Sequence, residues 1–167
     1  MGDEVSELSR DLIGRFATLN DIPVLVNHRR WMFEDMAAAQ GEKYPKAGLD
    51  AMDAAYAAQL HAEMPLGASR VWVIEDAGKI VASGAIRYAD WLPRPDGKKR
   101  GMVYVHSVYT VPDYRRMGLA RHVLQAMIDD CRAQGWPRIT LHASEAGKSL
   151  YESLGFVPTN EMRLVLE

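Results

Sequence analysis

The chain has 167 residues, of which 48% are hydrophobic and 25% are charged, as in an ordinary globular domain. The formal net charge of -2 provides no general attraction to nucleic acid or to an anionic membrane, so neither is an expected partner. A single cysteine, Cys131, excludes a disulfide within the chain and a cysteine-based metal cluster, and the five histidines lack the spacing of a metal site.

No targeting or membrane signal is recognisable in the sequence. There is no run of about 18 apolar residues that would span a bilayer. Residues Met1–Arg10 are acidic and polar, unlike the basic and apolar stretches of a signal peptide. We therefore expect one cytoplasmic domain covering residues 1–167, without a bound metal.

The first third of the chain predicts a short strand followed by two helices. Weak strand character covers residues 15–20, and Asn20-Asp21-Ile22-Pro23 is typical of a helix start. That helix is expected to end near Gly41. A second amphipathic helix follows, marked by apolar residues at spacings of three and four and closed by Pro65 and Gly67. These apolar residues are Leu49, Met52, Tyr56 and Leu60.

The hydrophobic period then changes to that of strands. Residues 71–74 and 80–86 are predicted strands joined by a hairpin turn, and a Pro- and Gly-containing loop covers 90–101. Residues 102–111 predict a strand buried on both faces. A helix follows from Gly118 to about Gly135, with its apolar stripe formed by Ala120, Val123, Leu124, Met127, Ile128 and Cys131.

The C-terminal third predicts a strand at 138–143, a helix at 144–154 and a last strand at 162–166. Strand–helix–strand units imply some parallel pairing, whereas the earlier hairpins imply antiparallel pairing. The predicted fold class is therefore α/β, with a central mixed sheet and helices on both faces. The last strand would leave an exposed sheet edge that a second copy could cover, so a homodimer is expected.

Chemistry is concentrated in Val108-Tyr109-Thr110-Val111-Pro112-Asp113-Tyr114-Arg115-Arg116-Met117-Gly118-Leu119-Ala120. A strand ends at proline, the chain turns through two arginines, and a helix begins at a small residue. A helix N-terminus exposes free N–H groups and a positive dipole end, and glycine lets a ligand approach the backbone closely. The residues alone leave two interpretations open: a phosphate site, or a helix start with solvated arginines. A P-loop and a G-x-G-x-x-G motif are both missing.

Two segments resemble the GNAT superfamily of acyl-coenzyme A N-acyltransferases. Arg115-Arg116-Met117-Gly118-Leu119-Ala120 matches the pyrophosphate-loop pattern R/Q-x-x-G-x-G/A, and Leu150-Tyr151-Glu152-Ser153-Leu154-Gly155-Phe156 is similar to the segment L-Y-E-x-x-G-F. The resemblance covers about Trp72 to Leu166. It implies a GNAT-like fold and transfer of an acetyl group from acetyl-CoA to an amine.

The resemblance also implies a cofactor site. Backbone N–H groups of the loop would hold the coenzyme A diphosphate, a role that falls to Arg116, Met117, Gly118, Leu119, Ala120 and Arg121, with Arg115 adding positive charge. The strand residues Tyr109, Thr110 and Val111 would pair with the pantetheine arm, and a splay from residues 139–141 would admit it. Ser144 stands where many family members have asparagine, and it is expected to cap its helix and bond to the arm.

For catalysis, the resemblance assigns Tyr151 as the general acid that protonates the leaving thiolate, and the alternative is a packed core tyrosine. The general base is open. Many family members use a glutamate on the central strand, where this chain has His106 and Ser107. His106 has a suitable ordinary pKa near 6.5, although a buried structural histidine is the competing interpretation. His142 and Glu145 are weaker candidates, and water could replace any of them.

The acceptor amine is not predicted by the sequence. Trp31, Tyr44 and Trp91 could line its pocket, and Lys98-Lys99-Arg100 is interpreted as a solvated hairpin tip. One alternative function is a non-catalytic acyl-CoA-binding sensor or interaction module. Another is a nucleotide-phosphate-binding regulator, which the missing nucleotide motifs disfavour.

Overall fold

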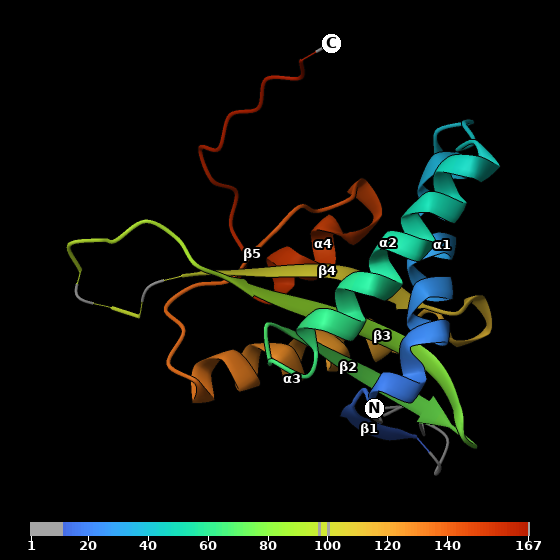
Figure 1. The fold of residues 1–167 in the computed structure, drawn as a ribbon, viewed down its shortest axis with the longest axis horizontal. Helices are drawn as coiled ribbons and strands as arrows, with labels where there is room; N and C mark the ends of the chain where they lie inside the picture. Colours follow the sequence, from blue (N-terminus) through green and yellow to red (C-terminus); the bar gives the residue numbers. More distant parts are fainter. Residues whose placement is uncertain (1–11, 97, 100, 167) are drawn as a thin grey trace, which may run out of the picture.

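The computed structural model describes residues 12–96, 98–99 and 101–166. Within this part of the chain five strands form one sheet in the order β1-β2-β3-β4-β5 (Figure 1). The strands are β1 (Ile13–Phe16), β2 (Ser69–Asp76), β3 (Lys79–Ala89), β4 (Met102–Thr110) and β5 (Thr140–Leu141). Neighbours from β1 to β4 are antiparallel, whereas β4 and β5 are parallel, which confirms the mixed sheet.

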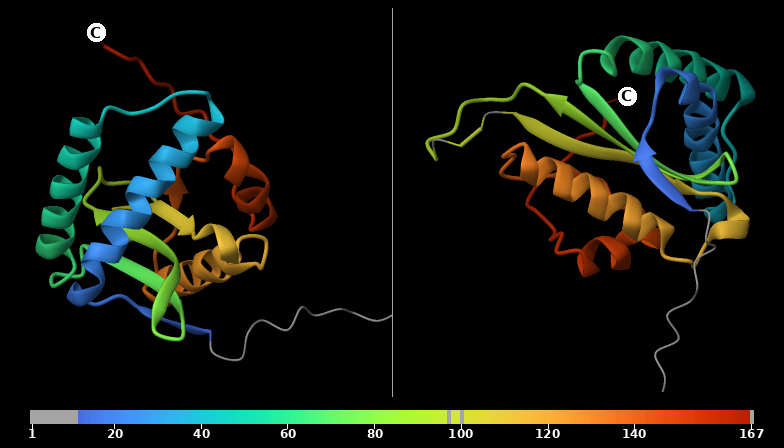
Figure 2. Two further views of the ribbon diagram at one scale, coloured as in Figure 1. Left: turned by 90° about the vertical axis from the view of Figure 1, so that its right-hand side faces the viewer. Right: turned by 90° about the horizontal axis from the view of Figure 1, so that it is seen from below.

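Helices cover both faces of this sheet, as predicted (Figure 2). They are α1 (Ile22–Ala39), α2 (Lys46–Glu63), α3 (Leu119–Ala133) and α4 (Glu145–Ser153), and short 3₁₀ turns occur at η1 (Leu19–Asp21) and η2 (Pro112–Tyr114). Helices α1 and α2 lie on one face, and α3 and α4 lie on the other. Pro23 lies in the first turn of α1, and Gly41 and Gly135 have positive φ just beyond α1 and α3, confirming the predicted helix ends.

Each face has its own apolar core. On the α3 face, Val103 and Val105 of β4 pack against the predicted helix stripe, in which Val123, Leu124 and Met127 are at most 1% exposed. On the other face, Ile22, Leu25 and Leu60 pack against β2 and β3. Cys131 is buried in the first core, and this burial raises the pKa of its thiol. The thiol is therefore poorly suited to act as a nucleophile.

Gly84 of β3 sets how closely α3 approaches the sheet. A β-carbon at this position would lie 2.7 Å from Cγ1 of Val123 and 2.9 Å from Cε of Met127. Both distances are shorter than ordinary carbon–carbon contacts. The absence of a side chain at Gly84 therefore lets α3 pack closely against β3.

The predicted last strand at 162–166 is wrong. These residues belong to no strand; they extend away from the sheet (Figure 1), and Met162 and Leu164 are 94% and 82% exposed. A strand needs a neighbour to accept its hydrogen bonds, and β5, whose edge is nearest, spans only Thr140–Leu141. The apolar composition of the segment alone does not supply that neighbour.

Two strands also have bounds that differ clearly from prediction. The strand expected at 15–20 is β1, which begins at Ile13 and ends at Phe16 because η1 bends the chain at Leu19. The strand expected at 138–143 is only the short β5. At the predicted hairpin tip, Lys98 and Lys99 are exposed as expected, and the ammonium of Lys99 lies 4.1 Å from the centroid of the Trp136 ring. Arg100 lies outside the described residues.

Candidate active site

The turn from β4 into α3 has an unusual backbone. Arg116 and Gly118 both have positive φ, of 63° and 77°, and Gly118 is the N-cap residue of α3. No side chain caps this helix, so the N–H groups of its first turn have no partner in the helix and none from a capping side chain. Together with the positive end of the helix dipole, they form a suitable receptor for a diphosphate.

Strand β4 is open on one side next to this turn. Its pairing with β5 comprises Tyr104 with Thr140 and Val105 with Leu141, where β5 ends. Strand β4 continues to Thr110, so in the described part of the chain no strand covers the β5 side of residues 106–110. This open edge is where the resemblance places the pantetheine arm of coenzyme A.

A bulge in β4 marks the start of the open edge. Ser83 pairs with Tyr109 and Ala85 pairs with His106, so Gly84 alone faces two residues of β4, Ser107 and Val108. Ser107 has a φ of 53°, which is uncommon for a residue other than glycine. A bulge of this kind bends the strand and redirects its side chains. Here the Ser107 hydroxyl contacts Arg29 of α1, and the His106 ring lies against Tyr56 of α2.

Helix α4 places Tyr151 on the α3 side of the sheet, where Leu150 and Leu154 also pack against the core. Burial, and to a smaller degree Tyr104, raises the pKa of the Tyr151 hydroxyl, so this group holds its proton at neutral pH. No hydrogen bond joins this hydroxyl to another described residue. Ser144 caps α4 as predicted, because its Oγ accepts a hydrogen bond from the backbone N–H of Gly147 at 3.2 Å.

His106 is largely enclosed. Its Nδ1 lies 3.0 Å from the hydroxyl of Ser107, and its Nε2 is buried without a partner among the described residues. Burial, with a further contribution from the cation of Arg29, lowers the pKa of His106 to about 4. The ring is therefore uncharged at neutral pH, and it is a weaker base than the ordinary imidazole that the sequence suggested.

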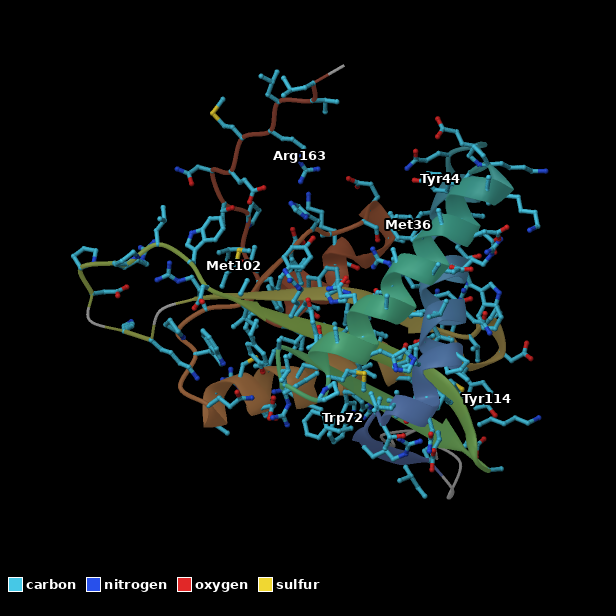
Figure 3. The ribbon with its side chains drawn as sticks, viewed as in Figure 1. Met36, Tyr44, Trp72, Met102, Tyr114 and Arg163 are labelled. Atoms are coloured by element: carbon cyan, nitrogen blue, oxygen red, sulfur yellow. The ribbon has the colours of Figure 1, made fainter. Side chains whose placement is uncertain are left out.

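The other candidate bases lie nearer to solvent. The hydroxyl of Tyr104 lies 2.5 Å from Nδ1 of His142, whose Nε2 lies 2.6 Å from a guanidinium nitrogen of Arg163. Arg163 belongs to the C-terminal segment, as Figure 3 shows. Glu145 is exposed in the first turn of α4.

Side chains of the loop point away from its backbone N–H groups. The Arg115 guanidinium donates to Asp35 of α1 at 2.6 Å and to the carbonyl of Thr110 at 3.0 Å. Arg121 donates to Ser153 at 2.6 Å and so joins α3 to α4. The side chain of Arg116 is exposed, whereas Leu119 is buried. The loop thus presents its backbone to a ligand, and only the Arg116 side chain is free to add charge.

The three aromatic residues expected near an acceptor are separated in space. Trp31 approaches Tyr109, with ring centroids 6.2 Å apart. Tyr44 lies in the connection between α1 and α2 (Figure 3), where it lines a hollow of about 520 Å³. Neither the turn from β4 into α3 nor Tyr151 lines this hollow. Trp91 is 55% exposed in the loop after β3.

Two residues of α1 that the sequence did not single out contact the central strands. His28 is 1% exposed and its Nδ1 lies 2.8 Å from the hydroxyl of Ser83, while Arg29 donates to Ser107 at 2.7 Å. The sequence feature that could have drawn attention to these residues is the run of basic side chains His28-Arg29-Arg30. The signal does not show which of them faces the sheet, because that depends on how α1 docks.

The described residues contain neither a metal-binding cluster nor a membrane-spanning helix. No group of three or more His, Cys, Asp or Glu side chains is placed to hold a metal ion. No helix in this part of the chain is long and apolar enough to cross a membrane.

Residues 32–156 match the acetyltransferase (GNAT) family. The chain belongs to this family. Among curated relatives, the GNAT chain is 39% identical over 90 residues to an L-methionine sulfoximine/L-methionine sulfone acetyltransferase of Pseudomonas aeruginosa, covering 52% of this chain and 49% of the relative. It is 35% identical over 95 residues to the L-amino acid N-acyltransferase MnaT of Escherichia coli, covering 55% and 52%. The alignments thus span about half the length of these relatives.

Comparison with solved structures also leads to the GNAT fold. A predicted acetyltransferase from Clostridium acetobutylicum, solved with acetyl-CoA, superposes with a TM-score of 0.82 at 24% identity, over 93% of this chain and 96% of the other. At this identity the likeness establishes the fold only.

Proposed function

We propose that this GNAT protein transfers the acetyl group of acetyl-CoA to a primary amine by direct attack within a ternary complex. The observation that carries the proposal is the combination of three features on β4 and on the helices that pack beside it. They are the uncapped start of α3 at Gly118, the open edge of β4, and a protonated, unpartnered hydroxyl on Tyr151.

The chain's groups fit coenzyme A in kind. A diphosphate suits the free N–H groups of the first turn of α3, and Gly118 has no side chain to obstruct it. The amide groups of a pantetheine arm suit the unpaired backbone of residues 106–110, in the manner of an added strand. Ser144 is committed to its helix cap, so its hydroxyl can offer the arm only its remaining hydrogen-bonding capacity.

In the proposed reaction the amine nitrogen attacks the thioester carbonyl carbon, the new C–N bond forms and the C–S bond breaks. Tyr151 donates its proton to the departing thiolate and recovers one from solvent. The amine must also lose a proton. Because the pKa of His106 is about 4 and its Nε2 is buried, we assign the final acceptance of this proton to water.

The names of the curated relatives support amino acids or their derivatives as acceptors. A thiol-release assay with acetyl-CoA and a panel of L-amino acids, alkylamines and amino sugars tests the proposal, with mass spectrometry of the acetylated product. Release of coenzyme A together with an N-acetylated product is expected. Binding of acetyl-CoA without release for any amine would favour a sensor, and would contradict the enzymatic proposal.

A further inference from the structure

Arg29 is a partly buried cation that no described carboxylate balances. Its guanidinium donates to the Ser107 hydroxyl at 2.7 Å, and its carbon lies 5.0 Å from the Phe33 ring centroid and 4.9 Å from that of Tyr56. One of its five N–H donors is therefore engaged in a hydrogen bond, and that bond is to a neutral group. Enclosing a cation without an anion is unfavourable, so this arrangement needs an explanation.

Other arginines near Arg29 do have carboxylate partners. Arg30, the next residue, pairs with Asp53 at 2.5 Å and Asp50 at 3.0 Å. Glu63 is the acid whose charge reaches the same cluster, but it is bound to Arg87 at 2.9 Å and to Ser69. The described fold thus uses its nearby carboxylates elsewhere and leaves Arg29 without one.

The position of Arg29 relates it to the proposed chemistry. Ser107 lies at the β4 bulge, where the open edge begins, and the Nε2 of His106 beside it is buried and unpartnered. The rings of Phe33 and Tyr56 hold the guanidinium by cation–π contact. The cluster thus holds a partly buried cation without a carboxylate partner next to the strand that would carry the acyl group.

We propose that Arg29 binds the carboxylate of the acceptor, so that the substrates of this enzyme are free amino acids or close analogues. The inference rests on the proposed acetyltransferase function. The planar guanidinium fork matches a carboxylate in bidentate geometry. In an α-amino acid the nitrogen lies only about 2.5 Å from the carboxylate carbon, so a carboxylate on Arg29 brings the amine to the bulge.

The charge of the receptor favours a carboxylate over a phosphate. A single guanidinium balances the single charge of a carboxylate, whereas a phosphate dianion would need a second cation. Arg87, a cation whose charge also reaches His106, is neutralised by Glu63. An amino sugar phosphate is therefore the competing acceptor class, and the experiment includes one.

The test compares L-methionine sulfone with its carboxamide, which differs only in the anion, and with glucosamine 6-phosphate. In the unmodified enzyme the acid should have the highest kcat/KM. Arg29→Gln should lower kcat/KM for the acid by about 30-fold, the loss of a charge-assisted hydrogen-bonded pair, and change that for the carboxamide by less than about 3-fold. Arg29→Lys should fall between the two.

Arg30→Gln is the matched control, because it removes the same charge from the adjacent residue, and it should leave the ratio of acid to carboxamide unchanged. Circular dichroism and acetyl-CoA affinity confirm that each variant is folded. An unchanged ratio in Arg29→Gln, or a preference of the unmodified enzyme for the carboxamide or the sugar phosphate, would overturn the inference while leaving acetyl transfer intact.

If no amine is acetylated, the proposed function fails, and direct binding still decides the role of Arg29. Calorimetric titration of L-methionine sulfone into the protein with coenzyme A present should give binding that Arg29→Gln abolishes and Arg30→Gln retains. Absence of binding to the unmodified protein, or equal binding to all three proteins, would overturn the carboxylate receptor.

Discussion

The ring of Tyr151 lies against the backbone of Gly147, one turn earlier in α4: a β-carbon on Gly147 would lie 2.9 Å from Cε2 of Tyr151. Gly147 also donates its N–H to Ser144, the cap of the helix. The absence of a side chain at Gly147 therefore gives the proposed general acid its position. The cap, the glycine and the tyrosine form one unit at the start of α4.

Gly147→Ala should separate stability from activity. Alanine favours the helix by up to about 1 kcal/mol, but its methyl group must displace the Tyr151 ring. We expect kcat to fall while the free energy of unfolding stays equal or rises. Gly48→Ala in α2 is the matched control, because a β-carbon there meets nothing within 4 Å. Equal kcat in both variants, by thiol release, would argue against a positioned Tyr151.

Tyr151→Phe should remove the proton donor without disturbing the packing of the ring. We expect kcat to fall by about 100-fold, the usual contribution of a general acid, with little change in the Kd for acetyl-CoA. Tyr44→Phe, far from the loop, serves as control and should retain full activity. The assignment of Tyr151 fails if the Phe variant keeps the kcat of the unmodified enzyme.

The pyrophosphate loop should bind through its backbone conformation. Gly118→Ala strains a residue with a φ of 77° and adds a methyl group where the diphosphate is proposed, so the Kd for acetyl-CoA should rise by about 10-fold or more. Arg116→Gly relaxes the backbone at a φ of 63° and removes only a side chain. It should leave the Kd within about 3-fold of its original value. The opposite order of effects, measured by calorimetry, would mean that the Arg116 guanidinium carries the binding.

Stability should decrease in mild acid because of buried histidine. Burial lowers the pKa of His28 to about 4, whereas an unfolded histidine titrates near 6.5. Between these values the unfolded chain binds the proton and the folded chain does not, so the free energy of unfolding falls as the pH is lowered from 6.5 to 4. The shift corresponds to about 3 kcal/mol. Urea denaturation at several pH values in this window measures it.

The variant His28→Asn should flatten this pH dependence in part, because His106, with a pKa also about 4, contributes in the same direction. His61→Asn is the control, because it removes a histidine whose side chain is exposed on α2. A free energy of unfolding that is constant between pH 6.5 and 4.5 would contradict the buried neutral state of both rings.

Local sequence signals predicted much of the architecture, because helix ends and buried helix faces depend on residues that are close together in the sequence. Pro23 and Gly41 bound α1, Gly118 begins α3, and the stripe from Val123 to Cys131 gives its buried face. The antiparallel hairpins and one parallel pair followed from the order of these elements. The predicted strand at 162–166 failed because strand formation depends on a partner, which the residues of the segment do not specify.

The site was predicted only where a short motif fixes its backbone. The loop from Arg115 to Ala120 and the segment around Tyr151 were recognised from their resemblance, and their proposed roles stay predictions. The Ser107 bulge depends on register between β3 and β4, and the orientation of Arg29 depends on how α1 docks. The low pKa of His106 arises mainly from burial in the folded protein, so it could not be predicted from the ordinary pKa of histidine. The homodimer and the cytoplasmic location also stay predictions.

The most direct test of the account is isothermal titration of the purified protein with acetyl-CoA, with ATP and NAD as controls. The start of α3 and the open edge of β4 predict micromolar binding of acetyl-CoA and no comparable binding of the two nucleotides. Failure of the folded protein to bind acetyl-CoA, or equal binding of ATP, would contradict the assignment of the loop at Gly118 and the acetyl transfer proposed from it.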